Sequence, residues 1–380
     1  MKNLKCRFFL AATLILLLLA GCAGHNSGST EGTSIPTDTH NSQKNEAGTS
    51  LILPAIQENY WGVYDNRCNV IYEPGFMSCN SINLTLLSAV PLEQEDVAVT
   101  LDTGWDMIYY LYPYDREEGI CYLNEDLLLM YQGVSAEELL EYHAGTVSPE
   151  RKSEINKWVF EYRALDDSKK PMIYRYTLDL GIPITEMDSN DVLDAFTITV
   201  NGETRTYQLG SIQNRVFEPI EFPYDPNYSL NCDDNLNFFG ANADVTSDGS
   251  IRLDNLKYTA VDDVVITGIR FFKGDDVQIQ SISCVQNTAD GAVIDTTWDM
   301  IQPIELMAGD SIFLNIQITD PFFAGTLGGW NTRYLLLEYR CGGETYELGI
   351  HFQFVQSLHD PFAYIAAEDG LDVLAYYSCR

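Results

Sequence analysis

Residues 196–209 have the sequence FTITVNGETRTYQL. Apolar and polar residues alternate through its first five positions, as in a strand with one buried face. Asn201 and Gly202 then tolerate the positive φ angles of a type I′ turn, and the alternation resumes in the last three positions. This pattern predicts a β-hairpin and favours a mainly β protein.

The same alternation recurs along the chain. It predicts strands at residues 82–90, 97–101, 173–180, 264–272, 277–282, 311–318, 334–340 and 346–354. Short strands at this spacing, separated by turn signals, predict antiparallel β-sandwiches. The pattern resembles bacterial immunoglobulin-like domains, in which two cysteines flank a tryptophan, as Cys284 and Cys341 flank Trp298 here. The resemblance names no particular family.

An internal repeat divides the chain into two copies. Residues 102–108, DTGWDMI, match residues 295–301, DTTWDMI, at six of seven positions. A second match follows in the same order, because GETRTYQLG at 202–210 resembles GETYELG at 343–349. Two ordered matches favour duplication of a domain. We therefore predict two immunoglobulin-like β-sandwich domains, at residues 51–215 and 216–380.

The first copy is longer because of a predicted α/β insertion at residues 109–171. Ser135 begins a capping box and Gly145 is a helix stop, which predicts one helix. Ser148 followed by proline predicts the start of a second helix. Residues 158–162 are predicted to form a strand. Long insertions often carry function, so a functional site is expected here first, with a purely structural flap as the alternative.

The N-terminus resembles the signal peptide of bacterial lipoproteins. Three basic residues precede an apolar run at 8–20, which is too short for a membrane span. The run ends in LAGC at 19–22, which resembles the lipobox. The resemblance implies cleavage of residues 1–21, lipid attachment to Cys22, and a location at the cell membrane facing outside the cytoplasm.

Composition limits the partners. Residues 22–50 are rich in Ser, Thr, Asn and Gly and nearly free of large apolar residues, so they are predicted to form a disordered tether. The chain carries a net charge of −33, and such an anionic surface repels phosphate backbones. Nucleic acid is therefore not an expected partner, whereas cations, neutral glycans and envelope proteins remain.

Seven cysteines remain beyond residue 22, so at least one thiol is unpaired in an oxidising compartment. The predicted disulfides are Cys68–Cys79 and Cys341–Cys379, because each closes a short loop. The alternative is that all are buried thiols. No CxxC motif is present, which argues against a zinc site.

Calcium is the one cofactor that the sequence suggests. Residues 244–251, DVTSDGSI, resemble the start of an EF-hand or dockerin loop, which implies Asp244, Thr246, Asp248 and Ser250 as ligands. Position twelve is an asparagine where the family has an acid. A hairpin turn explains the same residues, so both interpretations stay open.

The repeated Trp-Asp pair suggests a ligand-binding surface. Trp105 with Asp106, and Trp298 with Asp299, would form exposed sugar-stacking platforms, each with a polar partner. The alternative is that both tryptophans belong to the core. Only a structure distinguishes the two.

No catalytic signature was found. The chain has no GxSxG motif and no phosphate-binding glycine loop. The preferred function is therefore non-catalytic binding of a glycan, peptide or protein at the cell surface. Two alternatives stay open: an accessory subunit of a cell-envelope complex, and a hydrolase that uses acidic residues.

Overall fold

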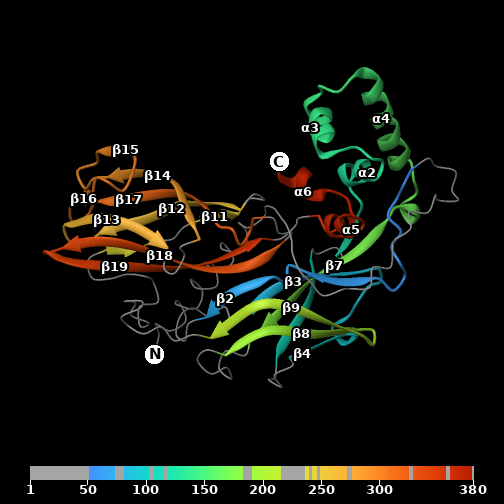
Figure 1. Cartoon of the computed structure of the whole chain (residues 1–380), viewed down its shortest axis with the longest axis horizontal. Helices are drawn as coiled ribbons and strands as arrows, with labels where there is room; N and C mark the ends of the chain where they lie inside the picture. The colour runs from blue at the N-terminus through green and yellow to red at the C-terminus, as the bar shows by residue number, and fades with distance from the viewer. Residues whose placement is uncertain are drawn as a thin grey trace, which may run out of the picture.

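The computed structural model describes residues 51–72, 81–101, 107–114, 119–182, 191–214, 236–238, 242–245, 249–271, 276–324, 328–356 and 360–378. Three β-sheets and a smaller group of helices form this part of the chain (Figure 1). The prediction of a mainly β fold is therefore confirmed. No helix in these ranges is long and apolar enough to span a membrane.

The first outer sheet belongs to the first copy of the repeat. Its strand order is β1 (Trp61–Tyr64), β3 (Ser81–Ser88), β7 (Met172–Gly181) and β5 (Ile108–Pro113), with β6 (Ile120–Tyr122) also paired to β7. All of these pairs are antiparallel. Two strands of the predicted insertion, β5 and β6, thus form one edge of this sheet.

The second outer sheet belongs to the second copy. It contains β10 (Leu236–Phe238), β11 (Asn242–Val245), β12 (Ser250–Ala260), β17 (Ser311–Thr319), β14 (Gln278–Asn287) and β15 (Val293–Thr297). Strand β17 lies in the middle of this sheet, as β7 does in the first. Strands β7 and β17 therefore hold equivalent places in the two copies of the internal repeat.

A third sheet runs through both copies. Its order is β16 (Ile304–Leu306), β13 (Val264–Phe271), β18 (Gly329–Cys341), β2 (Cys68–Tyr72), β9 (Glu203–Asn214), β8 (Val192–Val200) and β4 (Val97–Thr100), and β19 (Glu344–Gln356) also pairs with β18. Strand β2 is parallel to both β18 and β9. The prediction of purely antiparallel sheets is wrong at these two pairs. One of them, β18 with β2, joins the second copy to the first, and we call it the seam.

The predicted hairpin at residues 196–209 is confirmed as β8 and β9. Asn201 and Gly202 have φ angles of 49° and 84°, as the tight turn requires. The matching hairpin of the second copy, β18 and β19, turns at Gly342 and Gly343, whose φ angles are also positive. Both hairpins lie in the shared sheet.

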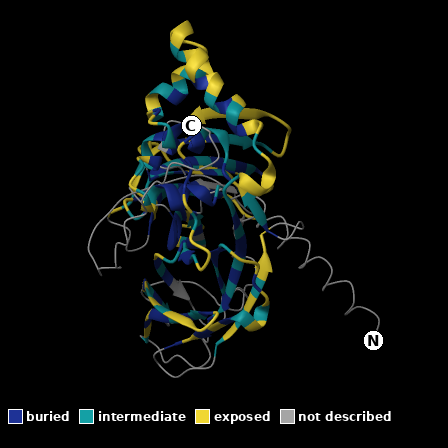
Figure 2. Ribbon diagram, turned by 90° about the vertical axis from the view of Figure 1, so that its right-hand side faces the viewer, coloured by how far each residue is buried: buried dark blue, intermediate teal, exposed yellow. Residues whose placement is uncertain are grey.

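Two apolar cores separate the layers. The first fills the space between the first outer sheet and strands β2, β9, β8 and β4, and includes Ile82, Leu178 and Phe196. The second lies between the second outer sheet and the rest of the shared sheet, and includes Leu314 and Leu337. Figure 2 shows the buried residues in dark blue inside these layers. The predicted boundary at residues 215 and 216 lies outside the described ranges.

Helices form a third core on the outer face of the first outer sheet. They are α2 (Glu125–Tyr131), α3 (Ala136–Ala144), α4 (Pro149–Arg163), α5 (Phe362–Glu368) and α6 (Val373–Ser378), and two short 3-10 helices lie at Gln94–Asp96 and Asp167–Lys169. The C-terminal helices α5 and α6 pack against α2 and α3 of the insertion. The insertion is thus completed by residues from the far end of the chain, which the sequence did not predict.

Both helix starts in the insertion are confirmed. The Ser135 hydroxyl accepts a hydrogen bond from the backbone N of Glu138, and Gly145 ends the helix at φ 74°. The strand predicted at residues 158–162 is wrong, because these residues continue α4. Ile155, Val159 and Tyr162 recur at helical spacing, so one face of the helix is buried.

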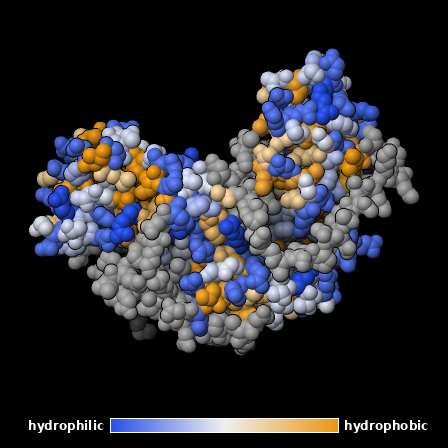
Figure 3. All heavy atoms as spheres, in the orientation of Figure 1, coloured by the Kyte–Doolittle hydropathy of each residue, from blue (hydrophilic) through white to orange (hydrophobic). Residues whose placement is uncertain are grey.

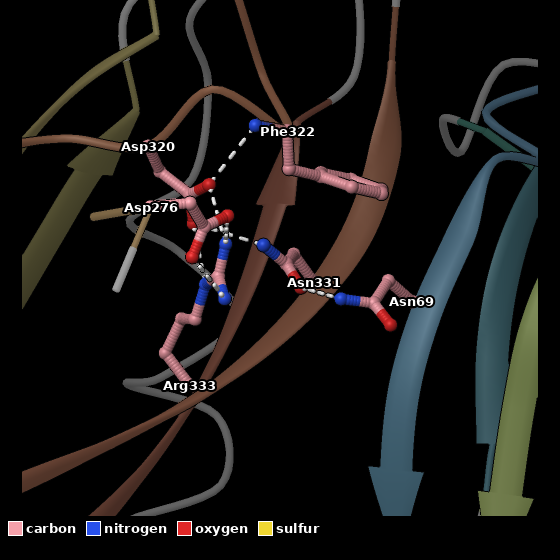
Figure 4. A network of polar contacts seen from close by, with 6 residues as sticks. All are labelled: Asn69, Asp276, Asp320, Phe322, Asn331 and Arg333. Atoms are coloured by element: carbon pink, nitrogen blue, oxygen red, sulfur yellow. Dashed lines mark hydrogen bonds and ion pairs between the residues drawn. The ribbon is translucent and has the colours of Figure 1, made fainter. Parts of the chain in front are cut away.

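A buried polar network lies where β18 meets β2 (Figure 4). The Asp320 carboxylate accepts hydrogen bonds from Nε and Nη2 of Arg333 at 2.8 Å each. It also accepts one from Nδ2 of Asn331 at 2.9 Å. Oδ1 of Asn331 in turn accepts a 2.9 Å hydrogen bond from Nδ2 of Asn69 on β2. The network therefore connects the second copy to the first across the seam.

Candidate functional site

Strand β5 places aromatic side chains on the outside of the first outer sheet. Alternation along the strand turns Tyr109 and Leu111 toward the first core and turns Ile108, Tyr110 and Tyr112 away from it. The exposed fractions of the last two are 52% and 49%. Exposed aromatic residues that lie side by side mark a binding surface more often than a chance arrangement.

The rings form an ordered row. The Tyr110 and Tyr112 rings are stacked with centroids 6.0 Å apart and planes 28° apart. The next tyrosine, Tyr114, is also exposed, and the guanidinium carbon of Arg175 lies 3.6 Å from the centroid of its ring. Arg175 itself is buried, so this cation–π contact holds the Tyr114 ring in place. We call Ile108, Tyr110, Tyr112 and Tyr114 the tyrosine face.

Polar groups lie next to the tyrosine face on the same side of the sheet. Strand register places Asp179 opposite Tyr110 and Thr177 opposite Tyr112. Asn83 and Thr85 of β3 continue the same rows on the other side of β7. One carboxylate oxygen of Asp179 is buried and has no hydrogen-bond partner within the described ranges. We call Asn83, Thr85, Thr177 and Asp179 the polar floor, and the tyrosine rings border it.

The polar floor ends at helix α5. The Thr85 hydroxyl donates a 2.7 Å hydrogen bond to Asp65, and the Tyr364 hydroxyl of α5 donates one of 2.5 Å to the other carboxylate oxygen. Tyr364 also stacks on Tyr64, with ring centroids 4.4 Å apart. The C-terminal helices thus cover one end of the sheet surface, and β5 leaves the other end open.

A second polar cluster ties the helices together. The Asp126 carboxylate accepts a hydrogen bond from the Tyr376 hydroxyl and lies 2.9 Å from Nε2 of His143. Burial raises the pKa of Asp360 to about 6, and this carboxylate accepts a hydrogen bond from the side chain of Asn124. Each contact joins two different helices or a helix to the segment before α5, so we assign the cluster a structural role.

The predicted tryptophan platforms fall in two places. Trp298 is buried in the second core, and its Nε1 donates a 2.8 Å hydrogen bond to the Gln302 carbonyl. The prediction of an exposed platform there is wrong, because the ring completes the packing between two sheets. Asp299 is exposed and accepts a hydrogen bond from the Ile301 backbone N. Trp105 and Asp106 lie outside the described ranges.

The predicted calcium loop connects two paired strands. Asp244 belongs to β11 and Ser250 begins β12, whereas Thr246 and Asp248 lie outside the described ranges. A strand therefore precedes the loop where an EF-hand has a helix. The described ranges contain no group of three or more His, Cys, Asp or Glu side chains placed to hold a metal. Calcium binding stays a prediction.

The two predicted disulfides have different outcomes. Cys68 is a free thiol buried in the first core, and burial raises its pKa to about 12. This disagrees with the predicted bond to Cys79, which lies outside the described ranges, because the Cys68 side chain is used for packing. Cys341 ends β18 and Cys379 lies outside the described ranges, so the second pair stays a prediction. Cys22 lies outside these ranges as well.

The tyrosine face was not among the residues predicted from the sequence. The signal was present, because IYYLYPY at 108–114 places an aromatic or apolar residue at every second position on each face of a strand. The sequence alone could not show which of the two faces is buried. Three of its four residues, Tyr110, Tyr112 and Tyr114, lie in the predicted insertion.

Comparison with known proteins gives only distant similarity. No protein-family model matches the chain, and no curated protein matches it in sequence. An alignment with the crystal structure of the collagen adhesin from S. aureus covers 78% of this chain and 94% of that chain, with 8% identity and a TM-score of 0.23. CfaE, the adhesive subunit of the CFA/I fimbria of enterotoxigenic Escherichia coli, aligns over 52% and 67%, with 12% identity and a TM-score of 0.18.

The C-terminal domain of the Streptococcus pyogenes antigen I/II-family protein AspA aligns over 79% of this chain and 100% of that chain. The identity is 8% and the TM-score is 0.17. TM-scores this low carry no argument about what this chain binds. Its function has to be inferred from its own residues.

Proposed function

We propose that the chain is a non-catalytic binding module that binds a neutral glycan on the tyrosine face. The observation that carries this proposal is the stacked, exposed pair Tyr110 and Tyr112 on an open strand. A sugar ring packs its C–H groups on an aromatic face, which has a negative quadrupole, and hydrogen-bonds through its hydroxyls. Asp179 and Thr177 supply polar groups on the same side of the sheet.

Net charge favours a neutral ligand over an anionic one. The chain carries a charge of −33, which repels acidic polymers approaching any part of its surface. A neutral sugar has no such cost, and its hydroxyls can hydrogen-bond to the half-buried side chains of Asp179 and Thr177. A site built to hydrogen-bond hydroxyls gains specificity, because a ligand without them leaves buried polar groups unpaired.

Tyr110→Ala and Tyr112→Ala should each weaken glycan binding about tenfold, because each removes one stacking ring worth about 1.4 kcal/mol. Isothermal titration calorimetry with neutral oligosaccharides of glucose, mannose and N-acetylglucosamine measures the effect. Tyr346→Ala is the matched control, since Tyr346 is also exposed and stacks on another tyrosine, Tyr339, at 5.3 Å. An absence of binding to every sugar, or an equal loss with Tyr346→Ala, contradicts the proposal.

We further propose that the chain is anchored to a membrane by lipid on Cys22, facing outside the cytoplasm. The support is the LAGC sequence at 19–22, after a basic start and an apolar run. Cys22→Ala should abolish incorporation of a labelled fatty acid and leave no mature chain in the washed membrane fraction. Cys6→Ala, a cysteine ahead of the cleavage site, should change neither. Labelling that survives Cys22→Ala contradicts the anchor.

A further inference from the structure

The second sandwich has an open strand edge at β15. Within the described ranges β15 pairs with β14 alone, and all five of its residues are exposed. The Trp298 backbone N donates a 2.9 Å hydrogen bond to the Ile282 carbonyl, which sets the alternation of the ladder. By that alternation, the N–H and C=O groups of Val293, Asp295 and Thr297 point away from β14. We call this row the β15 edge.

The β15 edge has little of the usual protection against strand addition. Natural edge strands are blunted by charged side chains, lysine above all, by proline or by a bulge. Strand β15 contains no lysine or proline, its one charged residue is Asp295, and its register with β14 has no irregularity. Instead it exposes apolar side chains, with Val293 67% exposed and Ile294 about half exposed. An edge left in this state is a template for another strand.

Further apolar side chains are exposed next to this edge. The segment 298–303 connects β15 to β16, the edge strand of the shared sheet, and Met300, Ile301 and Met307 around it are exposed. Figure 3 shows hydrophobic surface around β15, at the upper left. Exposed apolar side chains thus lie both on β15 and on the segment that follows it, and we call these residues the apolar patch.

The connecting segment is held in a fixed shape. Nε1 of Trp298 donates to the Gln302 carbonyl, and Asp299 accepts from the Ile301 backbone N at 2.9 Å. Met300 has a φ of 60°, a conformation that costs a non-glycine residue about 1 kcal/mol or more. These two hydrogen bonds fix the conformation of the loop, with Ile301 exposed. A preorganised surface of this kind loses little entropy on binding.

The negative charge around the β15 edge favours a basic partner. The sequence has no lysine or arginine between Lys273 and Arg333. Asp295 lies in the strand, Asp290 precedes it and Asp299 follows it. A second copy of this chain would bring acid against acid. A basic strand would pair each of these carboxylates, and its apolar side chains would cover the apolar patch.

We propose that the β15 edge binds an extended, basic segment of a partner protein, which adds a strand to the second outer sheet. Backbone hydrogen bonds to the β15 edge supply affinity in this mode. Specificity comes from alternating side chains on the incoming strand. Its apolar side chains contact the exposed apolar residues, and its basic side chains pair with the carboxylates. This interaction is separate from the tyrosine face, which lies on the first outer sheet.

The test uses the full chain with two synthetic peptides, one of alternating lysine and valine and one of alternating glutamate and valine. Fluorescence anisotropy should show binding of the lysine peptide alone. Hydrogen exchange should slow in residues 293–297 when that peptide is bound. Asp295→Pro removes an outward N–H without removing a bond to β14, so it should weaken binding about tenfold or more.

Two further variants keep the test decisive. Asp295→Asn keeps the N–H and loses the charge, so it should weaken binding only about threefold and reduce its salt dependence. Val293→Lys adds a repulsive charge to the edge and should abolish binding even where Asp295→Pro fails to fold. The proposal is overturned if the lysine peptide does not bind, or if its binding is unchanged in Asp295→Pro and Val293→Lys. It is also overturned if the glutamate peptide binds equally well, or if sedimentation shows self-association through this edge.

Discussion

Asp320→Ala should lower the free energy of unfolding by about 3–5 kcal/mol. Asp320 is fully buried and accepts three hydrogen bonds from the side chains of Arg333 and Asn331. Its removal leaves the guanidinium of Arg333, which is 8% exposed, without its buried counter-charge. The desolvated charge, rather than the lost contact, sets the size of the effect. Urea unfolding followed by tryptophan fluorescence measures it.

Asp276→Ala is the matched control for Asp320→Ala. Oδ2 of Asp276 also accepts a 2.9 Å hydrogen bond from Nη2 of Arg333, but the Asp276 side chain is 51% exposed. Its loss should therefore cost less than about 1 kcal/mol. The double variant Asp320→Leu with Arg333→Met should be more stable than Asp320→Ala, because no buried charge remains. Equal losses for Asp320→Ala and Asp276→Ala would contradict this explanation.

Gly210→Ala should destabilise the chain by about 3 kcal/mol or more, because it combines backbone strain with a steric clash. Gly210 has a φ of 95° in β9, and a Cβ there would lie 2.6 Å from the Cys68 carbonyl oxygen of β2. These two residues are paired in the parallel ladder. Backbone atoms on both sides cannot yield as a side chain would, so β2 has to move away from β9.

Gly202→Ala separates strain from the clash. Gly202 also has a positive φ, 84°, in the β8–β9 turn, but a Cβ there would meet nothing within 4 Å. Only the conformational cost of about 1 kcal/mol is expected. Thermal and urea unfolding of both variants give the comparison. If Gly210→Ala costs no more than Gly202→Ala, the close approach of β2 to β9 does not limit the packing of these two strands.

Local features of the fold could be predicted from the sequence. The turn at Asn201 and Gly202, the helix cap at Ser135 and the proline start after Ser148 each depend on hydrogen bonds and backbone angles within a few residues. Strand alternation is equally local. The prediction failed at residues 158–162, where aromatic residues suggested a strand but the helical spacing of buried positions decides the structure.

Long-range pairing could not be predicted. The parallel pairs of β2 with β18 and β9 join residues far apart in the chain, such as Cys68 and Trp330. No local pattern encodes that register. The docking of α5 on the insertion is of the same kind, since its contacts with α2 cross most of the sequence.

The candidate site also combines features that are local in the sequence with features that depend on the whole fold. Alternating tyrosines at 110, 112 and 114 are visible in the sequence, but the buried face is set by what packs against the sheet. Trp298 illustrates the converse, because a repeated tryptophan suggested function and proved to be packing. Exposure is a property of the whole fold, so the sequence identifies candidates and the structure selects among them.

The shared sheet also constrains how such a protein can evolve. The two copies of the repeat are continuous through β18 and β2 rather than forming two separate sandwiches. Loss of the second copy would expose the backbone of β2, and loss of the first would expose that of β18. Either loss would remove the hydrogen bond between Asn69 and Asn331. The pair is therefore expected to be inherited and recombined between genes as one unit, with new functions arising in insertions such as residues 109–171 and at the outer strand edges.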